Sequence, residues 1–209
     1  MNTSSTGPRK SSRFSVRLYQ YYRLSSSFLY AALLARWTIL LPLVGSKFLP
    51  GGIHQFLCYL LIFTSTFDLF WNAKFHGIKS LFRSRTTLKD LNFFYFVAVM
   101  HFHDDYEHAP VLKNTSYSCF IIGLAFTQMY YHWCKLFKAS SRPKRSVWWR
   151  MDSFLMMPLL YSSEFYLLML NLQMPNYHLS TQLETLNKVL LVLFIPVSLH
   201  AFKKQISLL

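Results

Sequence analysis

Apolar and polar stretches alternate along the chain, and most apolar stretches approach the roughly 20 residues that a helix needs to cross a bilayer. Four of them are long enough to predict membrane-spanning helices, over residues 27–44, 53–71, 117–134 and 153–172. Two shorter apolar stretches cover residues 91–103 and 189–202. The pattern therefore predicts an all-α fold, a polytopic transmembrane helical bundle with about six membrane segments.

The polar segments between these stretches suggest how the bundle is organised. The first two spans are joined by the short turn 46–52, which contains Pro-Gly-Gly and predicts an antiparallel hairpin. Before the first span, apolar residues recur at helical spacing among arginines over residues 13–24, which is typical of an amphipathic helix on a membrane surface. We therefore expect a cytosolic basic arm (1–26), one membrane domain (27–202) and a cytosolic tail (203–209).

The charge of the chain fixes the expected orientation. There are 22 Lys and Arg residues against 8 acids, and the formal net charge is +14. Basic residues gather in the amino-terminal arm, in segments 72–90 and 135–150 and in the tail; the exceptions are Arg36, Lys47, Lys113 and Lys188. The positive-inside rule places all four segments in the cytosol. Segments 72–90 and 135–150 share one side only if 91–134 enters and returns, which predicts six segments with both termini cytosolic; the alternative is four spans and two re-entrant segments.

Composition excludes several classes of protein. With 53% hydrophobic residues the chain is too apolar for a disordered protein. It has only three cysteines, an odd number, which excludes a disulfide scaffold. The positive charge is spread over segments that the topology defines, and we identify no RNA-binding platform, so we expect the lipid bilayer and no nucleic acid as a partner.

Three ionisable residues lie inside predicted spans, where charge is costly and usually functional. Arg36 and Glu164 lie at similar depths, so we predict an ion pair between the first and fifth spans. The alternatives are that Arg36 extends to the membrane surface, that these residues contact a partner protein, or that they act in catalysis. Asp68 lies within a turn of the cytosolic end of its span, where it can reach headgroups or water.

The densest group of polar residues follows the third segment, on the side predicted to be lumenal. It contains His101, His103, Asp104, Asp105, Glu107 and His108. Histidines and carboxylates at this spacing can bind a divalent ion or transfer protons. The cluster matches no metal motif with a second half elsewhere, so we interpret it as a solvated or docking surface and predict no metal site.

No enzyme signature is present in the sequence: it has no nucleophile elbow, no Gly-rich phosphate loop and no series of histidine boxes. We therefore predict no catalytic residue and no cofactor, and expect a non-catalytic subunit that binds another membrane protein. The alternative is a membrane-embedded enzyme that acts on a lipid or lipid-linked sugar through the His101–His108 cluster with Glu164.

The first hairpin has a recognisable sequence. Arg36-Trp37, the stretch LLPLVGSKFLPGGIHQFLCYL (residues 40–60) and the preceding YQYYRL resemble a small fungal family of endoplasmic-reticulum membrane proteins required for β-1,6-glucan synthesis. The resemblance covers nearly the whole chain. It implies a multi-pass protein of the endoplasmic-reticulum membrane that supports cell-wall biogenesis by binding a glycoside-hydrolase-like, glucan-synthesis membrane protein. It implies no catalytic residues.

Overall fold

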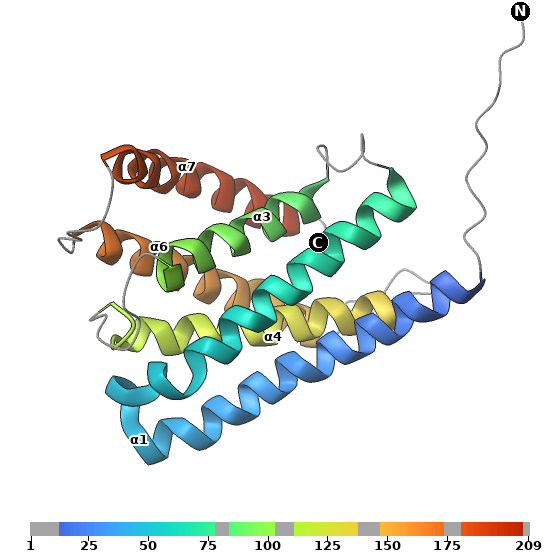
Figure 1. Ribbon diagram of the computed structural model, residues 1–209, viewed down its shortest axis with the longest axis horizontal. Coiled ribbons are helices and arrows are strands. Elements are labelled where there is room, and N and C mark those ends of the chain that lie inside the picture. The colour runs from blue at the N-terminus through green and yellow to red at the C-terminus, as the bar shows by residue number, and fades with distance from the viewer. Residues whose placement is uncertain (1–12, 78–83, 103–110, 138–146, 174–180, 207–209) are drawn as a thin grey trace, which may run out of the picture.

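The computed structural model describes residues 13–77, 84–102, 111–137, 147–173 and 181–206, and every regular element in these ranges is a helix. The longest is α1 (Arg13–His76), which folds back on itself (Figure 1). The reversal is at Gly45, whose φ of 71° lies in the left-handed region that favours glycine. We call residues 13–44 the first arm of α1 and residues 46–76 the second arm.

The two arms form the antiparallel hairpin that the sequence predicts. Tyr30 forms a hydrogen bond with Thr64, Tyr22 forms one with Asp68, and Tyr19 packs edge-on against Trp71. Residue numbers decrease along the first arm as they increase along the second, so the arms are antiparallel. The predicted turn 46–52 is itself helical, because the single left-handed residue Gly45 accomplishes the reversal. Each arm is about 45 Å long at 1.5 Å per residue, longer than a hydrocarbon core of about 30 Å.

The beginning of α1 is helical, as the spacing of its apolar residues predicts, and its position on a membrane surface stays a prediction. The helix runs without a break from Arg13 through the first predicted span, and Tyr22 and Arg23 are buried against the second arm and α4 (Thr115–Phe137). Sequence periodicity detects the apolar stripe of this segment, but it does not show which helix packs against the segment. Phe14, Leu18 and Tyr21 of that stripe are exposed, whereas the face that carries Tyr22 and Arg23 packs against the second arm and α4.

The remaining helices follow the predicted apolar stretches. The third segment consists of α3 (Arg85–Val97) and a π-helical turn, η1 (Ala98–Phe102). The fifth predicted span is formed by α5 (Val147–Met151), the π-helical turn η2 (Asp152–Met156) and α6 (Met157–Gln173). The last helix is α7 (Thr181–Ile206).

The core lies where α4 packs between α1 and α6. Helix α3 covers another side of α1, and α7 packs against α6 at the edge of the bundle (Figure 1). The core side chains come from several helices and include the stacked rings of Phe96 and Phe120, 4.2 Å between centroids. The interior is thus formed by helices distant in sequence.

Three of the described helices are long and apolar enough to cross a membrane. They are residues Phe14–His76, Val147–Gln173 and Thr185–Lys203. The first contains both arms of the hairpin, and the last includes the short predicted segment 189–202. Helix α4 and the third segment fall below this criterion in length or hydropathy, so the six-segment topology and the cytosolic termini remain predictions.

Candidate functional site

A buried ion pair links the two arms of α1. The Arg23 guanidinium Nη1 lies 3.1 Å from Asp68 Oδ1, and both side chains are at most 5% exposed. The Tyr22 hydroxyl contacts Asp68 Oδ1 at 2.7 Å and the backbone carbonyl of Thr64 at 2.8 Å. Asp68 is thus an acceptor for donors on the opposite arm, and its side chain is 3% exposed.

His132 joins helix α4 to this pair. Arg23 Nη1 lies 2.9 Å from His132 Nδ1. Because a guanidinium only donates hydrogen bonds, the histidine Nδ1 is the acceptor and the imidazole carries its proton on Nε2. The His132 ring also stacks on Tyr30, 5.8 Å between centroids. One guanidinium therefore bonds to both α4 and the second arm of α1.

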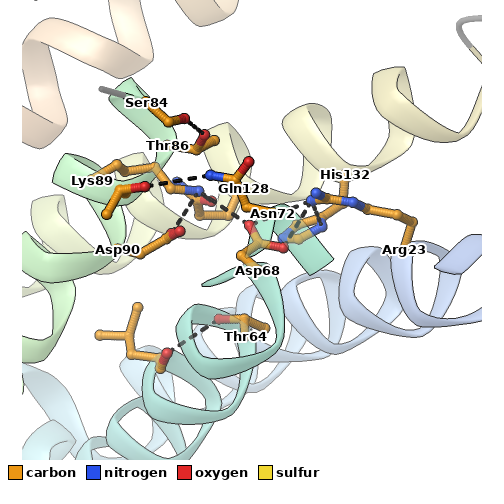
Figure 2. A network of polar contacts seen from close by, with 12 residues as sticks. Arg23, Thr64, Asp68, Asn72, Ser84, Thr86, Lys89, Asp90, Gln128 and His132 are labelled. Atoms are coloured by element: carbon orange, nitrogen blue, oxygen red, sulfur yellow. Dashed lines mark hydrogen bonds and ion pairs between the residues drawn. The ribbon is translucent and has the colours of Figure 1, made fainter. Parts of the chain in front are cut away.

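A second cation extends the network to helix α3. Lys89 Nζ lies 3.7 Å from Asp68 Oδ2 and 3.4 Å from Asp90 Oδ1, and it donates a hydrogen bond of 3.0 Å to Gln128 Oε1 of α4. Figure 2 shows Asp68 between Arg23 and His132 on one side and Lys89 on the other. Two cations and two carboxylates thus connect α1, α3 and α4.

Such a network suits an environment without water. A buried charge is costly when it is unpaired, and removing one member of a buried pair destabilises a protein strongly. Here each carboxylate has a cation within 4 Å, so the four charges balance. The arrangement can hold three helices in one register at one end of the bundle.

A cavity of about 380 Å³ lies beside the network. Its wall is aromatic and cationic and includes Tyr19, Arg23, Trp71, Tyr131 and Lys135. Arg23 lies over the rings of Tyr19 and Tyr131, 4.9 and 5.2 Å from their centroids. This cavity and the network together form the candidate functional site.

Glu164 and Arg36 do not form the predicted ion pair. Glu164 is 1% exposed and accepts a 2.6 Å hydrogen bond from Asn92 Nδ2 of α3. Arg36 is exposed on the first arm, with its guanidinium 5.8 Å from the centroid of the Phe56 ring. The pairing prediction is wrong because equal depth in a bilayer does not determine which way a helix faces.

Asn92→Leu is expected to lower the free energy of unfolding by about 1–3 kcal/mol, because it removes the hydrogen bond that Asn92 Nδ2 donates to the buried Glu164 carboxyl. The measurement is the thermal unfolding midpoint of the purified protein in detergent. Ser162→Ala, an exposed change on the helix of Glu164, is the control. An unchanged midpoint for Asn92→Leu would contradict a stabilising role for this hydrogen bond.

The predicted lumenal cluster lies almost entirely outside the described residues. His103, Asp104, Asp105, Glu107 and His108 belong to segment 103–110, and only the backbone of His101 is described, in η1. Among the described residues there is no group of three or more His, Cys, Asp or Glu side chains that could hold a metal ion. The cluster remains a prediction.

Sequence reasoning found Asp68 but missed Arg23, Lys89 and His132. Arg23 and Lys89 lie among other basic residues in segments assigned to the membrane surface, so charge counting gave no reason to single them out. A usable signal is the run Tyr22-Arg23 just before an apolar span, opposite an acid at the same depth of the next span in a hairpin.

Comparison with known proteins agrees with the resemblance of the first hairpin. The chain is 56% identical over 191 residues to the beta-1,6-glucan synthesis-associated protein KEG1 of Saccharomyces cerevisiae, covering 91% of this chain and 96% of that protein. No protein-family model matches the chain, and no solved structure is similar to it. Because the identity extends over nearly the full length of both proteins, the chain belongs to the family of beta-1,6-glucan synthesis-associated proteins.

Proposed function

We propose that this protein is a non-catalytic subunit of the endoplasmic-reticulum membrane that supports β-1,6-glucan synthesis by binding and stabilising another membrane protein of that pathway. The relative that is 56% identical is named for its association with β-1,6-glucan synthesis, and helices long and apolar enough to cross a membrane make this a membrane protein. The ion-pair network around Asp68 connects helices of the chain to one another, so its charges stabilise the chain's own fold.

The observation that carries this proposal is the exposed charge of Arg36. The residue lies about 13.5 Å from the Gly45 reversal at helical rise, on the outer side of the first arm. The ion pairs of the described residues do not include it, and its guanidinium lies 5.8 Å from the centroid of the Phe56 ring. A cation at this depth is costly against lipid. A carboxylate or polar group on a partner helix would offset that cost.

The apolar surface next to this charge fits the same role. Phe28, Ile39 and Leu43 of the first arm are 60% exposed or more. Helix α7 also exposes much of its apolar length, with Val192 70% exposed. These apolar surfaces suit contact with either lipid or a transmembrane helix. The charge of Arg36 favours a partner helix over lipid at its own position.

Arg36→Glu is expected to reduce the amount of co-purified partner about tenfold, equivalent to roughly 1.4 kcal/mol of binding free energy, and to lower cell-wall β-1,6-glucan in parallel. The measurement is affinity purification from detergent with quantification of stoichiometric membrane proteins, together with glucan content. Charge reversal of an acidic residue in the partner's transmembrane helix should restore both.

The matched control is Lys47→Glu, the same charge change at an exposed residue near the predicted lumenal end of the first arm. It should leave partner recovery and glucan content unchanged. If Arg36→Glu is expressed normally and retains full partner recovery and glucan content, Arg36 extends to the membrane surface and the partner contact is not made through it.

A further inference from the structure

The cavity beside the Asp68 network lies where four helix ends meet. The first arm of α1 and helix α3 begin there, and the second arm and α4 end there, contributing Tyr19, Thr86, His76 and Lys135 to its wall. The charge pattern assigns this end of the bundle to the cytosolic side. Its volume of about 380 Å³ is in the range of small-molecule sites.

The charge on the cavity wall is positive. Asp68 contributes a carboxylate, but both of its oxygens already have partners: Oδ1 has Tyr22 and Arg23, and Oδ2 has Lys89. Lys135 adds a further cation to the wall, 5.4 Å from the Tyr131 centroid. Asp68 and Asp90 balance Arg23 and Lys89, and Lys135 gives the wall one more cation than carboxylate.

The aromatic residues of the wall do not form a cage for a cation. Arg23 already lies over Tyr19 and Tyr131, and Lys74 lies 5.0 Å from the centroid of Trp71. A quaternary ammonium or amine group would meet ring faces that side-chain cations occupy, and it would be repelled by them. The chemistry of the wall therefore favours an anion over a cation.

Two hydrogen-bond donors in the same wall lack acceptors. Arg23 Nε and Trp71 Nε1 are buried, and within the described part of the chain neither has a hydrogen-bond partner. Unsatisfied buried donors are uncommon and call for an explanation. Ser84 and Thr86, whose hydroxyl groups bond to each other at 2.6 Å, line the same cavity and leave one hydroxyl proton for an acceptor. A phosphate supplies several acceptor oxygens to guanidinium, ammonium, indole and hydroxyl donors at once.

We propose that this cavity binds the phosphate of an anionic ligand, with Arg23 and Lys135 as the cations and Trp71 as a neutral donor. The sequence around the wall residues His76 and Lys135 supports an anionic ligand, because segments 72–90 and 135–150 contain eleven basic residues: Lys74, Lys79, Arg83, Arg85, Lys89, Lys135, Lys138, Arg142, Lys144, Arg145 and Arg150. The site is independent of the partner contact proposed for Arg36.

The test is titration calorimetry on the purified full chain in detergent. The probes are dihexanoyl phosphatidic acid, dihexanoyl phosphatidylcholine and inorganic phosphate. The variants are Lys135→Glu, which reverses a wall charge at an exposed residue, and Trp71→Phe, which keeps an aromatic ring but removes the N–H. Lys203→Glu, an exposed residue of α7, is the charge-matched control.

The proposal expects saturable binding of phosphatidic acid, weakened about tenfold by Lys135→Glu and about threefold by Trp71→Phe, and unchanged in Lys203→Glu. Equal binding of inorganic phosphate identifies a soluble phosphate as the ligand, whereas binding of phosphatidic acid alone identifies a lipid headgroup; both support a phosphate site. Equal affinity for phosphatidylcholine, undiminished binding by Lys135→Glu, or no saturable binding of either phosphate probe would overturn it.

Discussion

Asp68→Asn is expected to destabilise the protein by about 3–5 kcal/mol, the cost of removing one partner of a buried ion pair. The change conserves size but removes the charge that balances Arg23, whose side chain is 5% exposed. It also removes the carboxylate within 4 Å of Lys89. The consequence should be separation of the two arms of α1 at the end where they meet α4.

The measurement is the thermal unfolding midpoint in detergent, together with the yield of monodisperse protein. Thr66→Val, an exposed change on the same arm, is the control and should be close to the wild type. The double variant Arg23→Met with Asp68→Leu should recover much of the loss, because replacing both charges leaves neither unpaired. A wild-type midpoint for Asp68→Asn would show that the ion pair contributes nothing to stability.

Gly123→Leu is expected to cost at least about 3 kcal/mol, and Gly123→Ala about 1–3 kcal/mol, the range for overpacking a core. A Cβ atom at Gly123 would lie 3.0 Å from the backbone nitrogen and 3.1 Å from the Cα of Leu160. These are backbone atoms, so no side-chain rotation relieves the contact. Helices α4 and α6 would have to move apart at the centre of the bundle.

Gly51→Ala provides the matched control for this series. A Cβ atom at Gly51 meets nothing within 4 Å, and the residue lies in a helical stretch of the second arm. Alanine there should leave stability unchanged or raise it by about 0.5–1 kcal/mol. If both alanine variants unfold at the same temperature, close packing at Gly123 is not what holds α4 against α6.

Much of the fold could be predicted from the sequence, because apolar length and periodicity are local properties. The predicted spans 27–44, 53–71, 117–134 and 153–172 all lie within helices, and residues 189–202 lie within α7. The hairpin followed from the shortness of its connection, although the reversal occurs at Gly45 rather than across residues 46–52. A single glycine in the left-handed region reverses the chain, so the residues after it can remain helical.

The candidate site could be predicted only in part. Asp68 was identified because an acid inside an apolar span is unusual, but Arg23 and Lys89 were indistinguishable from the other basic residues that surround the spans. His132 accepts a hydrogen bond from Arg23, which lies 109 residues away in the sequence. The residue pattern of one helix does not specify how a neighbouring helix is rotated about its own axis, and that rotation decides which side chains meet.

The sequence by itself determined that this chain is an apolar, helical membrane protein, that its positive charge is segregated, and that it resembles a β-1,6-glucan synthesis family. Those properties depend on residue type and spacing along the chain. The tertiary structure alone decided that Asp68 pairs with Arg23, that Glu164 bonds to Asn92, and that Arg36 faces outward. The reason is physical: the cost of burying a charge is local, but the partner that offsets it is chosen by how helices pack.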